Sequence, residues 1–174
     1  MITGTAIFVA GVFAWTFLEY LIHAWLSHIF DTFATPLHQV HHRDPHAVFT
    51  IGGWIPVAIA WIGGLALWGF APGMVFATGM VAGFAAYEAL HYRIHFARPR
   101  NRVERWLRMH HLVHHYRAPS ACFGVTSAMW DLIFATEPAG AEMRQWRESV
   151  ADVPPLEGPS NAHRLFHFGI PAAR

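Results

Sequence analysis

Long apolar stretches alternate with short polar segments along this chain. The first stretch covers residues 1–30, where Glu19 is the only acidic or basic residue apart from histidine. An apolar helix needs about 20 residues to cross the ~30 Å hydrocarbon core of a bilayer, so the stretch predicts a transmembrane helix over residues 4–25. A cleaved signal peptide is the competing interpretation, but the segment has no basic n-region. We therefore expect it to remain as a span.

A second apolar stretch predicts a helical hairpin. Residues 45–87 contain no Asp, Glu, Lys or Arg, and the run Gly69-Phe70-Ala71-Pro72-Gly73 interrupts them near the middle. Gly and Pro together favour a tight turn. The arms, residues 50–69 and 73–94, each have about the length that a membrane span requires. The hairpin should therefore return to the side of the membrane from which it started.

The remaining segments are more polar. Residues 100–117 predict an interfacial or cytosolic helix, and residues 120–136 form an apolar segment too short to assign as a span. Beyond Glu137 the chain is polar. The expected fold is an all-α integral membrane protein with about three to four transmembrane helices. A membrane domain would cover residues 1–136, and residues 137–174 would be a polar C-terminal extension.

Arginine indicates the orientation in the membrane. The chain has twelve Arg and no Lys, and none of them lies in residues 44–92. Seven arginines flank the same ends of the predicted spans: Arg43, Arg93, Arg98, Arg100, Arg102, Arg105 and Arg108. The positive-inside rule makes those ends cytoplasmic, in a bacterial inner membrane or the endoplasmic reticulum. Met1 and the Gly69–Gly73 turn would then lie outside.

Composition narrows the class of protein. The apolar fraction is 54% and the charged fraction 13%, against about 25% charged residues in soluble domains. A net charge of +1 is too small to attract nucleic acid electrostatically. The single cysteine, Cys122, excludes a thiolate metal cage. With 174 residues, one catalytic unit without a fused redox module is expected.

Histidine is the unusual residue, because most of the 14 copies fall into clusters at the cytoplasmic ends of the predicted spans. The clusters are a pair, a triplet, a pair and a triplet: His23 and His28; His38, His41 and His42; His91 and His95; His111, His114 and His115. Helical residues four apart share a face, so each triplet can direct two or three imidazoles to one point. His23 and His28 are five apart, about 140° on an ideal helix. Either the helix unwinds there or the two side chains serve different metals.

Ten imidazoles are too many for one ion and suit two ions with about five nitrogens each. Soluble di-iron bundles use Glu-x-x-His pairs, which occur here once, as Glu88-x-x-His91. We expect Glu88 and Glu19 instead to accept the free N–H groups of the ligating His91 and His23. His46 and His110 are near enough to support the ligands or to be purely structural, and His163 and His167 in the extension are expected to have no role.

These residues resemble the fatty acid hydroxylase/sterol desaturase superfamily of membrane non-haem di-iron oxygenases. The resemblance runs from Phe17 to Thr136. Besides the histidine spacing, its carriers are Glu19-Tyr20-Leu21-Ile22-His23, His111-Leu112-Val113-His114-His115-Tyr116, Phe123-Gly124-Val125-Thr126-Ser127 and Trp130-Asp131. The last motifs are most similar to fatty acid 2-hydroxylases. The family spacing selects His111 rather than His110 as the ligand.

The resemblance implies an O2-dependent hydroxylase with a cytosolic dimetal cap facing a hydrophobic channel. It implies two iron ions, which zinc can replace during purification, and a lipid-like substrate taken from the membrane. Larger members commonly have four spans and a fused cytochrome b5. The absence of a fused cytochrome b5 domain from this sequence implies a separate electron donor, either a ferredoxin or cytochrome b5 with a reductase. Candidate channel-wall residues are Trp54, Trp61, Trp68, Phe84 and Trp130.

Three alternatives remain open from the residues. A carotenoid or sterol hydroxylase or desaturase of the same superfamily would share the histidine spacing. A metal transporter should distribute its histidines through the depth of the membrane rather than at one face. A haem electron carrier needs only axial ligands, so this alternative does not explain the two histidine triplets. The fatty acyl hydroxylase is the preferred hypothesis.

Overall fold

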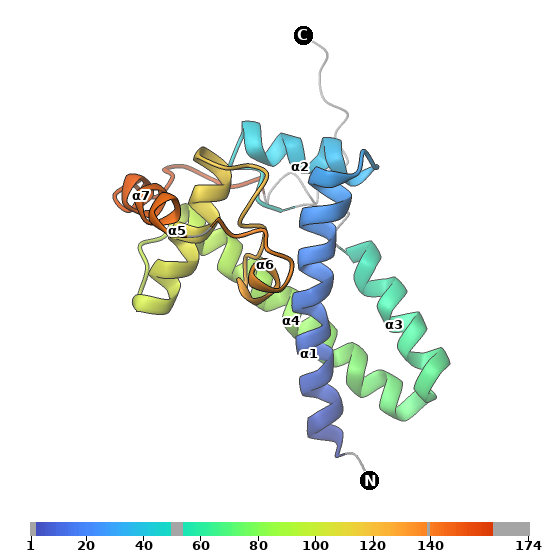
Figure 1. Ribbon diagram of the computed structural model, residues 1–174. Helices are drawn as coiled ribbons and strands as arrows, with labels where there is room; N and C mark the ends of the chain where they lie inside the picture. Colours follow the sequence, from blue (N-terminus) through green and yellow to red (C-terminus); the bar gives the residue numbers. More distant parts are fainter. Residues whose placement is uncertain (1–2, 50–53, 139, 162–174) are drawn as a thin grey trace.

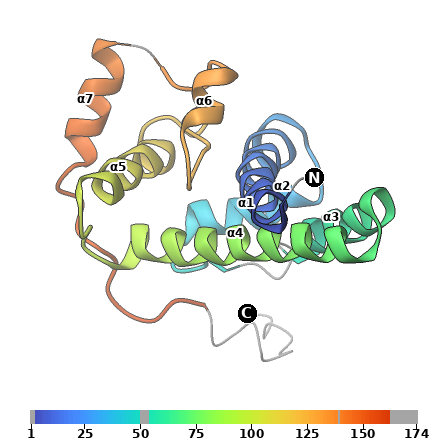
Figure 2. The ribbon, with the colours of Figure 1, turned by 90° about the horizontal axis from the view of Figure 1, so that it is seen from below.

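The computed structural model describes residues 3–49, 54–138 and 140–161, and all regular elements within them are helices. Helix α1 (Gly4–Tyr20) continues as the π-helix η1 (Leu21–Ile29), whose end lies beside α2 (Ala34–Arg43). Helices α5 (Arg102–Tyr116), α6 (Met129–Ile133) and α7 (Ala141–Val150) gather at one end of α4 (Phe70–Phe96), and α3 (Trp54–Trp68) lies at the other (Figures 1 and 2). The all-helical expectation is confirmed for the described residues.

Within the described residues, two helices are long and apolar enough to cross a membrane: Gly4–Ile29, formed by α1 and η1, and α4. The third expected span corresponds to α3, which has 15 residues, about 22 Å at the helical rise of ~1.5 Å per residue. Residues 50–53 of that expected span lie outside the described residues. The structure therefore supplies two candidate spans where the sequence predicted three or more.

The hairpin between α3 and α4 turns more tightly than predicted. Gly69 alone separates the two helices, with a φ of +76° that glycine adopts without strain. Helix α4 already begins at Phe70 rather than at Gly73. Pro72 fits inside the first turn because the first N–H groups of a helix have no partner within it. The Gly-Pro segment thus starts α4 instead of forming a longer turn.

Helices α1 and α4 cross in very close contact. A Cβ atom at Gly79 would lie 2.2 Å from the carbonyl oxygen of Phe8, and one at Gly11 would lie 2.2 Å from that of Phe76. Above the crossing, the buried Trp15 packs edge-on against Phe84. This contact fixes η1 beside the C-terminal half of α4, the two places where the first and third histidine clusters lie.

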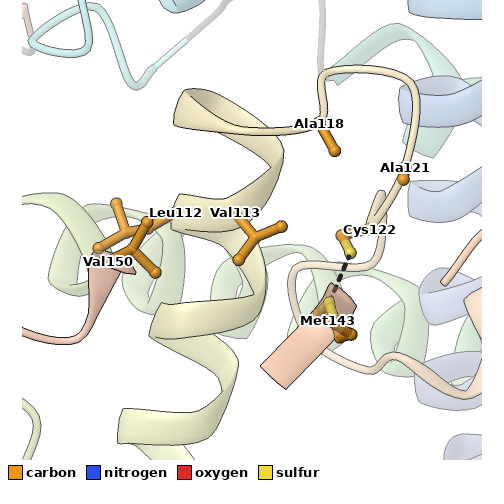
Figure 3. Close-up of a cluster of buried hydrophobic side chains, with 7 residues drawn as sticks. All are labelled: Leu112, Val113, Ala118, Ala121, Cys122, Met143 and Val150. Carbon is orange, nitrogen blue, oxygen red and sulfur yellow. Dashed lines mark hydrogen bonds between the residues drawn. The ribbon is translucent and has the colours of Figure 1, made fainter. Parts of the chain in front are cut away.

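Helices α5, α6 and α7 form a cap, and this cap has a small hydrophobic core of its own. Leu112 and Val113 of α5 pack with Met143 and Val150 of α7 and with the buried Cys122 (Figure 3). The helix expected over residues 100–117 is confirmed as α5. The apolar segment 120–136 is mostly an irregular loop with only the five-residue α6, because Asp131 satisfies loop N–H groups in place of a helix.

The polar extension lies against the cap and the histidine-bearing helices. Within its described residues, the backbone N–H of Leu156 donates to the carbonyl of His95 at 2.7 Å. The side-chain amide of Asn161 pairs with the backbone of Phe49. The extension thus reaches back to the end of α4 and to the segment after α2.

Candidate metal centre

The structure brings all ten clustered histidines together in two groups of five. Within each group, one ring nitrogen of every side chain lies within 4.8 Å of the others. The first group contains His23, His28, His38, His42 and His114. The second group contains His41, His91, His95, His111 and His115. His46 and His110 belong to neither group, and His163 and His167 lie outside the described residues.

Each triplet is divided between the two groups. His38 and His42, four residues apart on α2, point to the first group, while His41 points to the second. On α5 the division is reversed, since His114 alone joins the first group. Successive helical residues are rotated by about 100°, so neighbours cannot share a face whereas residues four apart do. Helices α2 and α5 therefore contribute to both groups.

The first group contains a closed ring of four Nε2 atoms. The distances around it are 3.0 Å from His23 to His38, 2.9 Å from His38 to His42, 3.0 Å from His42 to His114 and 3.1 Å from His114 to His23. Two imidazole nitrogens at right angles around an ion, each ~2.1 Å from it, are about 3.0 Å apart. The ring therefore has the spacing of four ligands around one ion.

Backbone carbonyls fix the tautomers of two ring members. Nδ1 of His23 lies against the carbonyl of Phe123, and Nδ1 of His114 is 2.8 Å from that of Ala121. A carbonyl only accepts, so both Nδ1 atoms carry the proton and both Nε2 atoms present lone pairs. These two lone pairs face each other across 3.1 Å. A cation between them converts this repulsion into ligation, so the donor set fits a metal ion.

The second group is more deeply buried. Nε2 of His91 is 3.0 Å from that of His41 and 3.1 Å from that of His111, and Nε2 of His95 is 3.1 Å from that of His111. Burial, followed by repulsion from His42, lowers the pKa of His41 from 6.5 to about 3. Burial also lowers the pKa of His111. These imidazoles are held neutral, the form that binds metals.

The π-helical turn η1 explains the spacing of five between His23 and His28. In a π-helix the hydrogen bonds join residues five apart, as between the N–H of Phe30 and the carbonyl of Trp25 at 2.7 Å. Residues i and i+5 are then stacked about one turn apart. Both histidines consequently face the same group. Of the two alternatives, the change in helical winding is the one that the structure adopts.

A mostly apolar cavity of about 110 Å³ lies beside both groups, between η1, α2 and α4. Its polar lining includes His23 and His38 of the first group, His41 and His91 of the second, and the two acidic residues Glu19 and Glu88. The apolar lining includes Trp15, Ile22, Leu26, Phe33, Leu37 and Phe84. An aliphatic chain in this cavity would lie next to both histidine groups.

Of the four expected wall residues whose side chains the structure describes, only Phe84 lines this cavity. Trp61 and Trp68 are 44% and 51% exposed on the outer surface. Trp130 packs on Phe17 with ring centroids 4.6 Å apart, and the side chain of Trp54 lies outside the described part of the chain. Trp15 was missed because a tryptophan in a span more commonly packs or anchors at the interface.

Comparison with known proteins agrees with this geometry. The model of the fatty acid hydroxylase family matches residues 8–136. The chain belongs to the fatty acid hydroxylase family. The resemblance inferred from the histidine spacing is thereby confirmed.

Relatives in this family include proteins named as fatty acyl or fatty acid 2-hydroxylases. Dihydroceramide fatty acyl 2-hydroxylase FAH1 of Arabidopsis thaliana is 34% identical over 76% of this chain and 60% of its own length. Human fatty acid 2-hydroxylase is 31% identical over 75% of this chain and 39% of its own length. The solved hydroxylase domain of full-length scs7p superposes with a TM-score of 0.67 at 28% identity, covering 88% of this chain and 59% of that one. The chain thus spans about 60% or less of the curated relatives it matches.

In this family member, Glu19 has a different role from the one predicted. Its carboxylate accepts from the backbone N–H groups of Val125 and Thr126 and from the Thr126 hydroxyl. The Nδ1–H of His23 donates instead to the carbonyl of Phe123. Glu19 therefore reaches the ligand indirectly, because it anchors the loop that carries this carbonyl.

Glu88 also differs from the prediction. It lines the cavity, but among the described residues no hydrogen bond joins it to His91, whose Nδ1 has no partner. The spacing of three residues places the two side chains on neighbouring positions of α4 without aligning their polar atoms. A carboxyl group beside the cavity can instead contact what the cavity holds.

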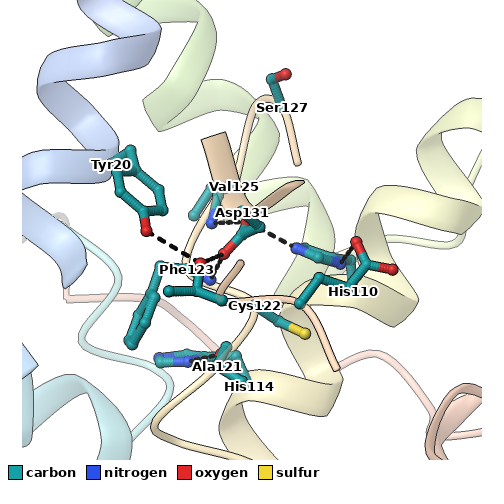
Figure 4. A network of polar contacts seen from close by, with 12 residues as sticks. Tyr20, His110, His114, Ala121, Cys122, Phe123, Val125, Ser127 and Asp131 are labelled. Atoms are coloured by element: carbon teal, nitrogen blue, oxygen red, sulfur yellow. Dashed lines mark hydrogen bonds and ion pairs between the residues drawn. The ribbon is translucent and has the colours of Figure 1, made fainter. Parts of the chain in front are cut away.

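Asp131 is the supporting residue to which sequence reasoning assigned no role. It is fully buried and accepts from Phe123 N–H and Gly124 N–H, both at 2.8 Å, from His110 Nε2 at 3.0 Å and from the Thr136 hydroxyl at 2.7 Å (Figure 4). Burial opposes its ionisation, but the bonds from His110 and the other donors outweigh this and lower its pKa. A carboxylate within an otherwise apolar segment was the available signal. His110 accordingly supports the loop rather than a metal.

Proposed function

We propose that this protein is a membrane-bound, O2-dependent non-haem di-iron monooxygenase that hydroxylates the aliphatic chain of a lipid, with a fatty acyl chain as the preferred substrate. The observation that carries the proposal is the placement of two five-histidine groups against one apolar cavity. The names of the relatives, which are fatty acyl 2-hydroxylases, favour the same reaction.

The donor sets suit two transition-metal ions. All ten ligands would be imidazoles: His23, His28, His38, His42 and His114 for one ion, and His41, His91, His95, His111 and His115 for the other. Imidazole binds iron and also zinc, so zinc can replace iron during purification. When bound, the iron pair would supply the activation of O2 and the cleavage of an unactivated C–H bond, which lie beyond protein side chains.

The chain itself would bind and orient the substrate. The apolar wall, including Trp15 and Phe84, would exclude water from the acyl chain and hold one carbon beside the histidine groups. Glu19 and Asp131 would position the ligands through the loop at residues 121–126. Electrons would come from a separate ferredoxin, or from cytochrome b5 with its reductase.

A membrane location follows from the two long apolar helices, Gly4–Ile29 and Phe70–Phe96. Exposed apolar side chains on their flanks, including Val9, Phe13 and Val81, are 57%, 52% and 41% exposed, which a lipid environment would cover. With the arginine-flanked ends cytoplasmic, both histidine groups would face the cytoplasm. A lipid substrate would then enter the cavity from the membrane.

Heavy oxygen distinguishes this reaction from its alternatives. The purified, iron-loaded chain is supplied with a reductase–ferredoxin system, membrane lipids and 18O2, and the lipids are analysed by mass spectrometry. We expect products that gain one labelled oxygen atom. His42→Ala should abolish the product and lower bound iron, whereas His46→Ala, outside both groups, should retain both. Label derived from water, or loss of two hydrogens without oxygen, would contradict hydroxylation.

A further inference from the structure

A second cavity, of about 610 Å³, lies away from the histidine groups between the start of α5 and the segment Ala151–Pro155. Its wall is strongly cationic, because Asp152 is its only acidic residue. Five arginines line it: Arg98, Arg100, Arg102, Arg105 and Arg108. The volume of this cavity lies in the range typical of small-molecule binding sites.

Arg108 forms the buried part of this wall. It is only 5% exposed, and among the described residues its Nε and Nη2 atoms have no hydrogen-bond partner. A buried, unpaired guanidinium is costly, because ionised groups removed from water need a compensating charge. Burial accordingly lowers the pKa of Arg108. The described part of the chain keeps a charged donor here without supplying its acceptor.

The neighbouring carboxylate is already occupied. Glu104, one turn before Arg108 on α5, accepts from Arg93 Nε and from the backbone N–H of Arg100. Within the described residues, the side chains of the other lining arginines donate no hydrogen bonds to protein groups. Among the described residues, the cavity therefore gathers several guanidinium groups without a hydrogen-bond acceptor around one volume, with Asp152 as the one acid in its lining.

We propose that this cavity binds a phosphate group, carried either by a phospholipid headgroup or by a soluble phosphate compound. Guanidinium groups bind phosphate through paired N–H···O bonds. A phosphate carries up to two negative charges and several acceptor oxygens, so it can engage Arg108 and more exposed arginines at once. The bound group would also link α5 to Ala151–Pro155, which precedes the Leu156 contact to His95.

Binding is tested on the full-length, metal-loaded chain in a neutral detergent. Isothermal titration calorimetry uses inorganic phosphate and dihexanoyl phosphatidic acid, each compared with sodium chloride at equal ionic strength. Arg108→Gln removes the buried donor, and Arg105→Gln removes an exposed donor whose loss should not impair folding. Arg144→Gln is the matched control, because Arg144 is an exposed arginine on α7 outside the cavity.

We expect the wild-type chain and Arg144→Gln to bind phosphate with equal affinity, and the two cavity variants to bind ~10-fold or more weakly. Tighter binding of the lipid than of inorganic phosphate identifies a headgroup site, and the reverse identifies a soluble ligand; either supports the proposal. Wild-type affinity for phosphate in both cavity variants overturns the proposal, because phosphate would then bind elsewhere, for example at the metal ions. An equal response to chloride, or an equal loss in Arg144→Gln, also overturns it.

Discussion

Replacing Asp131 with asparagine tests whether the loop at residues 121–125 holds metal ligands in place. The substitution keeps the size of the side chain but exchanges one carboxylate oxygen for an NH2 group. If the remaining oxygen keeps the bonds from Phe123 N–H and the Thr136 hydroxyl, the NH2 group faces Gly124 N–H and His110. Two buried polar groups then lose their acceptor.

The expected cost follows from these two groups. Each buried donor without an acceptor costs about 1–3 kcal/mol, so the free energy of unfolding should fall by about 2–6 kcal/mol. The displaced loop carries the carbonyls of Phe123 and Ala121, which orient His23 and His114. Losses of such supporting contacts typically reduce metal affinity or activity by ~10–100-fold. Stability and metal binding should therefore decline together.

The assay combines chemical denaturation in detergent micelles with metal analysis by mass spectrometry. Asp31→Asn is the matched control, since Asp31 is exposed and the described residues include no partner for its carboxylate. It should stay within ~0.5 kcal/mol of the wild type, as surface substitutions usually do. If Asp131→Asn also stays within that range and retains full metal content, the loop does not position the ligands.

Three further outcomes are expected. Glu19→Gln should leave the chain folded but lower metal affinity or turnover by ~10–100-fold, because it weakens the anchor of the same loop; unchanged values of both measurements would contradict this role. Gly79→Ala should destabilise the α1–α4 crossing by about 1–3 kcal/mol in a denaturation assay, whereas Gly63→Ala, with open space around the added methyl, should be neutral or slightly stabilising. In the metal-free chain the folded-state pKa of His41 is depressed from 6.5 to about 3. Between these pH values the unfolded state binds more protons, so the free energy of unfolding should be at its full value above pH 6.5 and decrease as the pH falls toward 3. A free energy of unfolding that stays constant or rises as the pH falls would be inconsistent with a buried neutral imidazole.

The sequence predicted the chemistry because that information is local. Residue type and spacing along a helix are enough to state that His91 and His95 share a face and that ten imidazoles suit two ions. Apolar length and the absence of charge likewise predicted the helices that became α1 and α4. These features depend on a few neighbouring residues and on helical geometry, so they can be derived without knowing the fold.

The tertiary structure alone decided how the parts combine. The division of each triplet between two groups depends on where α2 and α5 cross η1 and α4. The π-helical winding that turns His28 to the same group as His23 is likewise visible only in the three-dimensional structure. The same holds for Glu19 and Asp131, whose partners in the loop lie 106 and 8 residues away. Sequence spacing carries no information about which distant backbone N–H will face a buried carboxylate, since that depends on the packing of the whole cap.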